Sequence, residues 1–323
     1  MNASNVSKTD SKKAGGTHGE PGRVAVVGSL NMDLVVRAAR LPKPGETLAG
    51  QTFQQVPGGK GGNQAVAAAR LGANVSMIGC IGQDGNGEAL RQGLAAENID
   101  CSGVGTSRSR PTGVAMIIVD DASQNAIVIV AGSNAEVTPA TIAAHEALLA
   151  AADIVVCQLE TPPDTVRAAL ESARRLGKIT VLNPAPAASE LPADWFDLID
   201  YLIPNELEAA TLSGVEITTP DDARHAAGVL RGRGARNVIV TLGSQGVFAL
   251  LDGEEGRHFS APAVKAIDTT AAGDTFIGGF AAELARGETV ADAIAFGQRA
   301  AAIAVTREGA QPSIPHRREV ASA

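Results

Sequence analysis

The sequence predicts an α/β fold in which a doubly wound, mostly parallel sheet is flanked by helices. Three observations lead to this prediction. Strand-like and helix-like segments alternate along the chain after residue 138. The expected strands are continuous apolar runs, as in parallel sheets that are buried on both faces. Hydrophobic residues make up 45% of the chain but aromatic residues only 3%, so a large core must consist mainly of aliphatic side chains.

The folded part is expected to begin at Arg23 with a strand, a break at 28–33 and a second strand. An Ala-rich segment then predicts a helix that ends at Gly72. Two β-rich runs joined by "DASQ" are typical of a hairpin. The elements expected in this half are a strand at 24–28, a helix at 61–73, a strand at 75–82, a helix at 87–99, and strands at 112–120 and 125–132.

The second half has the regular alternation. Its expected elements are a helix at 138–151, a strand at 153–158, a helix at 162–176, strands at 178–182 and 199–203, helices at 205–213 and 220–233, and a strand at 237–242. Apolar residues between 276 and 284 keep helical spacing, which predicts a further helix from about Gly273. This order implies helices on both faces of the sheet.

Polar or Gly-rich residues follow the expected strands at their carboxyl ends, where ligands bind in such folds. They are Asn31 and Asp33 after 24–28, Glu160 after 153–158, Asn183 after 178–182, Asn205 after 199–203, and 243–246 after 237–242. Ordinary turns are the alternative, because Asn, Asp and Gly favour turns. Their coincidence at one edge of the sheet favours a ligand site.

The composition limits the class of protein. A net charge of −8 argues against a nucleic-acid surface, which needs a basic stripe. Backbone dipoles could still bind a small anion. Cys80, Cys101 and Cys157 lack metal spacing and are interpreted as free thiols in a reducing cytoplasm. No apolar run reaches the ~18–20 residues of a membrane span. Residues 1–22 are expected to be a disordered tail and 317–323 a second tail.

The stretch "DTTAAGDTFIGG", residues 268–279, places small residues before an expected helix. The first turn of a helix presents unpaired N–H groups and the positive end of the dipole. An anion could approach the backbone of 271–273 closely, as a phosphoryl group in transfer would. Asp274 beside that position could accept a proton from an attacking hydroxyl. The alternative is that Asp274 only caps the helix.

A second Gly-rich stretch, "PGGKGGNQAVAAARLGA" at 57–73, also leads into an expected helix. Gly58 and Gly59 could act as a hinge, while Lys60 and Asn63 could bind the hydroxyls of a polyol. A flexible loop with a solvated Lys is the alternative. The P-loop, the Rossmann fingerprint and the protein-kinase catalytic loop are all missing from the sequence.

Together these stretches resemble the PfkB carbohydrate kinase family, and within it closely resemble the kinases that act on D-ribose. The amino-terminal signature matches "GGKGGNQAVAAARLG" and the carboxyl-terminal signature matches "DTTAAGDTF". Similar features occur in "GSLNMD", "QLETP", "LNPAPA", "PNELEA", "TLGSQG" and "VTREGAQPSIP". The likeness covers about residues 23–316, which it implies to be one kinase domain with a small β-sheet lid from about 34–56 and 112–132.

The resemblance implies phosphorylation of D-ribose at O5 by ATP, with Asp274 as the base. It implies an anion hole from the backbone of Ala271, Ala272 and Gly273. The residues implied to hold the sugar are Asn31, Asp33, Gly59, Lys60, Asn63, Glu160 and Asp274. Those implied to contact ATP are Asn205, Thr241, Leu242, Gly243, Ser244, Gln245, Gly246, Gly273 and Gln298, the last in place of a His common in the family.

The resemblance also implies two cations and a partner. Glu208 is implied to bind Mg²⁺ through water. A K⁺ ion is implied to bind at Asp268, Thr270, Ala304, Arg307, Gly309 and Ser313, mostly through backbone carbonyls. The lid is implied to pair two subunits into a homodimer.

Other functions stay open at this point. Another sugar or nucleoside kinase of the family is one alternative, although a purine base needs apolar surface and the lid segments offer only Phe53. A sugar-binding protein without catalysis is a second, against which the intact "AAGD" argues. A dinucleotide oxidoreductase fits the α/β pattern but lacks the fingerprint.

Overall fold

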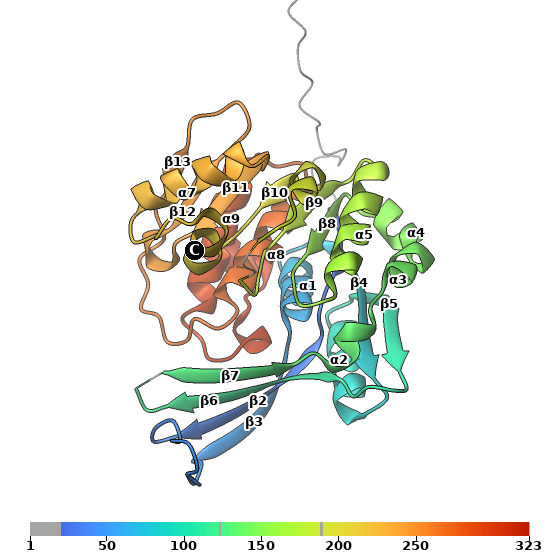
Figure 1. The fold of residues 1–323 in the computed structure, drawn as a ribbon, viewed down its shortest axis with the longest axis vertical. Coiled ribbons are helices and arrows are strands. Elements are labelled where there is room, and N and C mark those ends of the chain that lie inside the picture. Colours follow the sequence, from blue (N-terminus) through green and yellow to red (C-terminus); the bar gives the residue numbers. More distant parts are fainter. Residues whose placement is uncertain (1–20, 123, 188–189, 323) are drawn as a thin grey trace, which may run out of the picture.

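A computed structural model describes residues 21–122, 124–187 and 190–322 of the chain (Figure 1). The predicted tail at 1–22 therefore lies outside the described residues except for its last two. The other predicted tail differs from expectation, because Arg317–Ala321 forms the short helix α10 and Val320 is buried. No helix in the described ranges combines the length and apolarity needed to span a bilayer.

Within these ranges, nine strands form a large sheet that is mostly parallel. In spatial order they are β13 (Arg257–Phe259), β12 (Val247–Leu250), β11 (Asn237–Thr241), β10 (Tyr201–Leu202), β9 (Ile179–Leu182), β8 (Ile154–Cys157), β1 (Arg23–Val27), β4 (Asn74–Gly82) and β5 (Asp100–Ser107). Only the β11–β12 and β12–β13 pairs are antiparallel among these described strands. The predicted fold class is confirmed.

The large sheet is buried on both faces, which explains its apolar strands. In β1, Val24 and Val26 enter one core, while Ala25 and Val27 enter the other. The first core is covered by α1 (Lys60–Arg70), α2 (Gly85–Ala96), α8 (Ala272–Ala285), α9 (Val290–Ala304) and α10. The second is covered by α3 (Pro139–Ala144), α4 (Glu146–Ala151), α5 (Pro163–Arg175), α6 (Glu206–Ser213), α7 (Pro220–Gly232) and the 3₁₀ turn η2 (Ala193–Leu198).

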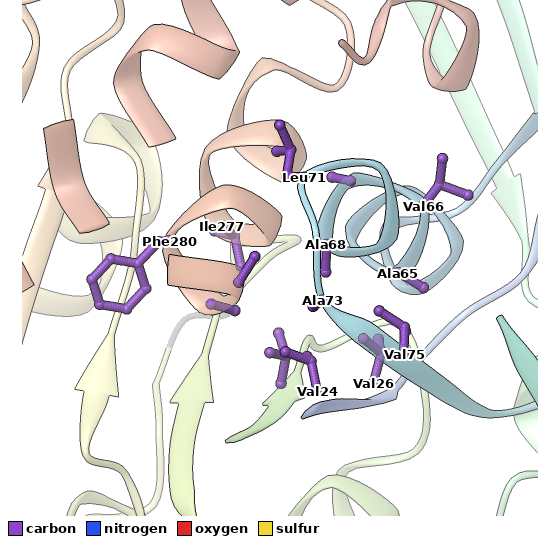
Figure 2. Packing of buried hydrophobic residues seen from close by; sticks show 14 of the residues in the cluster. Val24, Val26, Ala65, Val66, Ala68, Leu71, Ala73, Val75, Ile277 and Phe280 are labelled. Carbon is purple, nitrogen blue, oxygen red and sulfur yellow. The ribbon is translucent and has the colours of Figure 1, made fainter. Parts of the chain in front are cut away.

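Helices α1 and α8 pack closely over the middle of the sheet (Figure 2). A Cβ on Gly278 would lie 2.4 Å from Ala67 Cβ and 2.7 Å from Ala68 N, so a larger residue would separate the two helices. Ala65, Ala68 and Ile277 fill the space between this pair and the strands below. The small residues of α8 therefore allow a helix contact, and that contact brings the first turns of α1 and α8 together.

A smaller sheet extends from one end of the molecule (Figure 1). Its strands, in spatial order, are β3 (Thr52–Gly58), β2 (Asn31–Ala38), β6 (Gly113–Asp120) and β7 (Asn125–Val130). The β2–β6 pair is parallel, whereas β2–β3 and β6–β7 are antiparallel. Its exposed apolar side chains are Phe53, Met116, Ile127, Val128, Ile129 and Val130. The sequence-based view that Phe53 alone offers such surface was therefore wrong.

Several elements differ from the sequence-based expectation. The break after β1 is shorter than predicted, because β2 already begins at Asn31. The helix expected at 138–151 is divided at His145 into α3 and α4. Strand β5 was missed because "DCSGVGTS" is polar and Gly-rich, and its pairing with β4 determines its conformation. Strands β12 and β13 and helix α9 were not predicted individually.

Candidate active site

A cavity of about 200 Å³ lies at the carboxyl ends of β10 and β11, beside the first turn of α8. It is lined by Lys60, Asn183, Ile203, Asn205, Glu208, Thr241, Thr269, Ala271, Ala272, Gly273, Asp274 and Ile277. The strand-end residues Asn183, Asn205 and Thr241 thus meet the two Gly-rich helix entries in one place. This is the edge at which parallel α/β sheets bind ligands.

Asp274 is buried, with 7% of its surface exposed, and its carboxylate is held by helix α1. Asn63 Nδ2 donates to Asp274 Oδ2 at 3.0 Å, and Gln64 Nε2 donates to Oδ1 at 2.9 Å. Among the described residues, no Lys, Arg or His forms an ion pair with it. Helix α8 has Ala271 at its N-cap and no side-chain cap, so the helix-cap alternative for Asp274 is not supported.

The first turn of α8 has the backbone geometry of an anion site. Ala271 adopts a left-handed conformation with φ of 58°, which is uncommon for a residue with a Cβ. Ala272 N–H donates to Thr269 O at 3.2 Å, and Thr275 N–H donates to Ala271 O. Gly273 and Asp274 lie between these two residues, and within the described chain neither of their N–H groups has a backbone acceptor. Two free donors at the positive end of a 14-residue helix therefore lie beside the Asp274 carboxylate.

The Gly-rich entry to α1 is ordered by its own contacts. Gly59 precedes the helix with φ of 80°, and a Cβ there would lie 2.7 Å from Asn31 N. Glu160 Oε2 accepts from Lys60 N–H at 3.1 Å and from Ser29 Oγ at 2.5 Å. The Lys60 side chain lines the cavity and is only partly exposed. A flexible loop with a solvated Lys does not describe this segment.

A second cavity of about 380 Å³ adjoins the small sheet. It is lined by Asn31, Ile129, Ala131, Asn134, Ala135, Leu159, Glu160, Thr161, Pro162 and Pro186. Asn31 and Glu160, both predicted to bind sugar, are therefore on its wall. Asn63 donates to Asp274, and its buried Oδ1 has no hydrogen-bond partner among the described residues. That oxygen could accept a hydrogen bond from a hydroxylated ligand.

Several acidic groups face this region, and they change one another's protonation. Burial, and next the charges of Glu160 and Asp274, raise the pKa of Asp33 to about 7. Burial raises the pKa of Glu208 as well. For Lys60, burial opposes the charged form, but the charges of Asp274, Glu160 and Glu208 together outweigh it and raise its pKa. The cationic Lys60 side chain thus lies near three carboxylates, which favour its charged form.

Glu208 is held at the start of α6 by a capping box. Its carboxylate accepts from Asn205 N–H and Asn205 Nδ2, both at 3.0 Å, while Glu208 N–H donates to Asn205 Oδ1 at 2.8 Å. Both residues line the first cavity. Carboxylate and amide oxygens are suitable for a hydrated Mg²⁺ ion, which usually keeps several waters. The donor set fits the metal that the sequence predicts.

Of the residues predicted to contact ATP, Asn205, Thr241 and Gly273 line the first cavity. The others do not line it. Leu242 is buried, and residues 243–245 form a 3₁₀ turn. Gln245 Nε2 donates to Thr218 O at 3.0 Å. Gln298 is buried on α9 and donates to Phe259 O at 3.0 Å. Their contact with a nucleotide stays a prediction.

The residues predicted to bind K⁺ come from the 268–274 loop and from the 304–313 segment, and hydrogen bonds join these two parts of the chain. Asp268 accepts from Thr270 N–H and from Gly309 N–H, each at 2.9 Å. Burial favours the protonated form of Asp268, but the hydrogen bond from the Thr270 hydroxyl, together with those from the two N–H groups, outweighs it and lowers the pKa. Ser313 is fully buried and donates from Oγ to Ala310 O. Carboxylate, hydroxyl and carbonyl oxygens are the ligands a hard cation prefers. No cluster of three His, Cys, Asp or Glu side chains suited to a metal occurs in the described ranges.

Sequence reasoning missed residues that support these groups. Gln64, Gln158 and Asn183 form a buried hydrogen-bonded chain next to Asp274, and Asn183 had been singled out only as a strand end. Asn134 Nδ2 donates to Asn31 Oδ1 at 2.7 Å, and Ser29 contacts Glu160. Gln64 adjoins Asn63 in the amino-terminal signature, and that adjacency was the available signal.

Comparison with known proteins gives a consistent result. Residues 22–317 match the pfkB family carbohydrate kinases. Ribokinase of Haemophilus influenzae is 46% identical over 92% of this chain and 96% of that protein. Ribokinase of Staphylococcus aureus is 40% identical over 92% of this chain and 98% of that protein. A solved structure of Arabidopsis thaliana ribokinase, complexed with ribose and ATP, has a TM-score of 0.88 at 32% identity and covers 93% of this chain and 98% of that chain.

Proposed function

The chain belongs to the pfkB family of carbohydrate kinases, and we propose that it phosphorylates D-ribose at O5 with ATP to give D-ribose 5-phosphate and ADP. The relatives named ribokinase support this activity. One observation carries the chemical proposal. The buried Asp274 carboxylate lies beside unpaired backbone N–H groups at the start of α8. A proton acceptor and an anion site are thus adjacent, as phosphoryl transfer requires.

In the proposed reaction, Asp274 accepts the proton of the O5 hydroxyl as that oxygen attacks the γ-phosphorus. The γ-phosphoryl group moves to O5, and ADP leaves. The backbone of 271–273 stabilises the charge that develops on the transferred group, with the free N–H of Gly273 as a donor. Because the Ala272 N–H already donates to Thr269, Ala272 contributes through its small size rather than through a donor.

The proposed sugar site lies between the two cavities. Lys60 and Asp274 contribute from the first, and Asn31 and Glu160 from the second. Asn63 supplies the buried Oδ1 atom that lacks a partner in the described chain. Gly58 leaves room for the Asp33 carboxylate, since a Cβ at Gly58 would lie 2.2 Å from Asp33 Oδ2. The full proposed set is Asn31, Asp33, Gly59, Lys60, Asn63, Glu160 and Asp274.

For the nucleotide we propose the side of the first cavity that Asn205 and Thr241 line, extending over 241–246 toward Gln298. Mg²⁺ bound with ATP would neutralise phosphate charge. Glu208 would hold that ion through water, since its carboxylate lines the cavity and Asn205 fixes its orientation.

Three further properties are part of the proposal. A K⁺ ion at the Asp268 region would hold the 268–274 loop from behind. A homodimer would form through the small sheet, whose β7 strand is exposed along its whole length and carries four exposed apolar side chains, Ile127, Val128, Ile129 and Val130. A cytoplasmic location is the third property. The use of ATP as co-substrate and the free cysteines of the described chain support it.

A coupled ADP-release assay over sugars and nucleosides tests the function directly. We expect D-ribose to have the highest kcat/KM, with an ADP yield that depends on Mg²⁺. The panel should include 2-deoxyribose, fructose and the common nucleosides. The second cavity makes nucleosides an informative arm, because Ile129 and Ala131 adjoin the sugar-binding residue Asn31. A better nucleoside or fructose substrate would replace the ribose assignment, and no ADP release with any substrate would favour a sugar-binding protein.

A further inference from the structure

Gln64 lies at the centre of a buried chain of side-chain amides that none of the proposed roles uses. It is 1% exposed and comes from the first turns of α1. Its Nε2 donates to Asp274 Oδ1 at 2.9 Å and to Asn183 Oδ1 at 3.2 Å. Its Oε1 accepts from Gln158 Nε2 at 2.7 Å. Both amide protons and the oxygen are therefore in use.

The direction of these hydrogen bonds is determined by the ends of the chain. An ionised Asp274 can only accept, so the Gln64 nitrogen must face it. Asn183 Nδ2 donates to Ile203 O at 3.0 Å and to Glu208 Oε2 at 3.3 Å. Both of these oxygens accept, which turns the Asn183 oxygen toward Gln64. Each amide thus donates to the next group: Gln158 donates to Gln64, and Gln64 donates to Asp274 and to Asn183. Asn183 in turn donates to Glu208.

The choice of an amide at this position has a chemical consequence. A cationic partner would bind the Asp274 carboxylate more strongly and make it a weaker base. Two neutral N–H donors, from Asn63 and Gln64, instead hold one oxygen each and leave the remaining lone pairs free to face the cavity. Such contacts fix the orientation of the carboxylate without neutralising its charge.

We propose that Gln64 is a positioning residue for phosphoryl transfer. It holds the Asp274 carboxylate toward the sugar hydroxyl and, through Asn183, links its position to that of Glu208 on the nucleotide side. This inference rests on the proposed kinase function with Asp274 as base. Gln64 itself does not line either cavity, so it acts through Asp274 and not on the substrate.

The test is steady-state kinetics of Gln64→Met, which keeps the length of the side chain and removes its hydrogen bonds. We expect kcat to fall roughly 10–100-fold, the scale expected for a misplaced reacting group. KM for ribose and for ATP should stay within about threefold, because Gln64 does not bind either substrate. A purely structural role would lower the fraction of active enzyme without this split, so active protein is counted by burst titration or ligand binding.

Gln64→Glu is the second variant, because it keeps the shape and places a carboxylate 2.9 Å from Asp274 Oδ1. The acidic limb of its kcat profile should move to higher pH, since like charges favour protonation. The other charged groups facing Asp274 are Lys60 on α1, Asp33 on β2 and Glu208 on α6, and they are unchanged in the comparison. This variant decides the question if Gln64→Met does not fold.

Gln92→Met is the matched control, because Gln92 lies on the surface of α2 and, within the described part of the chain, its side chain hydrogen-bonds only to Glu88. Its kcat and KM should equal those of the wild type. Asp274→Asn is measured in the same assay. If it is inactive while both folded Gln64 variants keep wild-type kcat and pH profile, the positioning role is overturned and the proposed function stands. If Asp274→Asn is itself fully active, the proposed base is wrong.

Discussion

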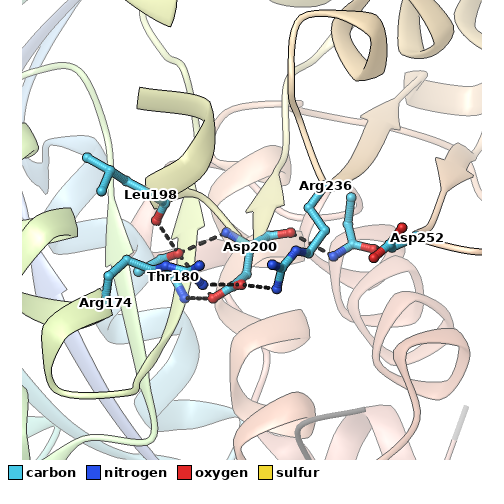
Figure 3. Close-up of polar contacts among 7 residues, drawn as sticks. Arg174, Thr180, Leu198, Asp200, Arg236 and Asp252 are labelled. Atoms are coloured by element: carbon cyan, nitrogen blue, oxygen red, sulfur yellow. Dashed lines mark hydrogen bonds and ion pairs between the residues drawn. The ribbon is translucent and has the colours of Figure 1, made fainter. Parts of the chain in front are cut away.

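Asp200 and Asp274 are both buried, at 8% and 7% exposed, yet their surroundings differ in charge. Asp200 precedes β10 at the amino end of that strand, and two guanidinium groups bind its Oδ1 (Figure 3). Arg174 lies at 2.8 Å and Arg236 at 3.2 Å, while Thr180 N–H donates to Oδ2 at 3.0 Å. Asp274, at the carboxyl edge, receives hydrogen bonds only from neutral amides among the described side chains.

The comparison separates a structural carboxylate from a reactive one. Asp200 is neutralised by cations from α5 and from the segment before β11, and so joins neighbouring parts of the sheet. Asp274 is oriented without being neutralised. Lys60 lines the same cavity, but in the described structure it forms no ion pair with Asp274 within 4.0 Å. A carboxylate in the second situation stays available to accept a proton.

The largest expected effect is that of Asp274→Asn. The amide keeps the size of the side chain but cannot accept the hydroxyl proton, so kcat should fall roughly 10²–10⁴-fold, the usual contribution of a general base. Binding of ribose, measured by calorimetry, should stay near normal. Wild-type turnover in this variant would remove the functional difference between the two aspartates.

Asp33 is a third buried carboxylate in this comparison, and like Asp274 it takes part in none of the described ion pairs. Its pKa is raised to about 7, so between pH 4 and pH 7 the folded protein holds a proton that the unfolded chain releases. Stability should therefore fall as pH rises through this range. The free energy of unfolding of the wild type should fall by about 1–3 kcal/mol between pH 5 and pH 8 because of Asp33. This fall should be absent in Asp33→Asn.

Denaturant titrations of Asp33→Asn and wild type at these two pH values measure the difference. The same variant should raise KM for ribose, because the proposed site loses an acceptor for sugar hydroxyls, while KM for ATP changes little. Identical pH dependence of stability in the two proteins would show that Asp33 titrates as an ordinary carboxyl.

Asp200→Asn should have the opposite result to Asp274→Asn. We expect a loss of about 1–2 kcal/mol in stability, because two charged hydrogen bonds are weakened, with kcat per folded molecule unchanged. Urea unfolding measures the loss. Asp252→Asn is the matched control, since Asp252 is largely exposed and its 3.4 Å contact with Arg231 is a surface pair worth about 0–1 kcal/mol. Reduced turnover in folded Asp200→Asn would contradict a purely structural role.

The smallest expected effect concerns the monovalent cation. At constant ionic strength, K⁺ should raise the wild-type rate severalfold and Na⁺ less, because an ion at Asp268 would preorganise the 268–274 loop. Asp268→Ala should weaken this response. A rate that is indifferent to replacing K⁺ by a bulky organic cation would leave Asp268 as a turn residue that binds Thr270 and Gly309.

The sequence by itself determined the fold class and the chemical character of the site. Apolar strands such as 24–27 and 154–157 show double burial locally, because every residue of such a strand meets a core. The small residues before Asp274 likewise predict the start of a helix whose backbone an anion can approach. Both signals lie within a few consecutive residues, so they can be read without knowledge of the fold.

Only the tertiary structure decided which side chains support these groups. Gln64 and Asp274 are 210 residues apart, and the position of Gln64 next to Asn63 does not by itself indicate that the Gln64 amide holds a carboxylate. The sequence gives no sign either that Asp200 is neutralised and Asp274 is not, or that the Ala272 N–H is occupied by Thr269. The physical reason is that charge balance and hydrogen-bond satisfaction depend on distances between separate elements, which packing of the helices on the sheet determines.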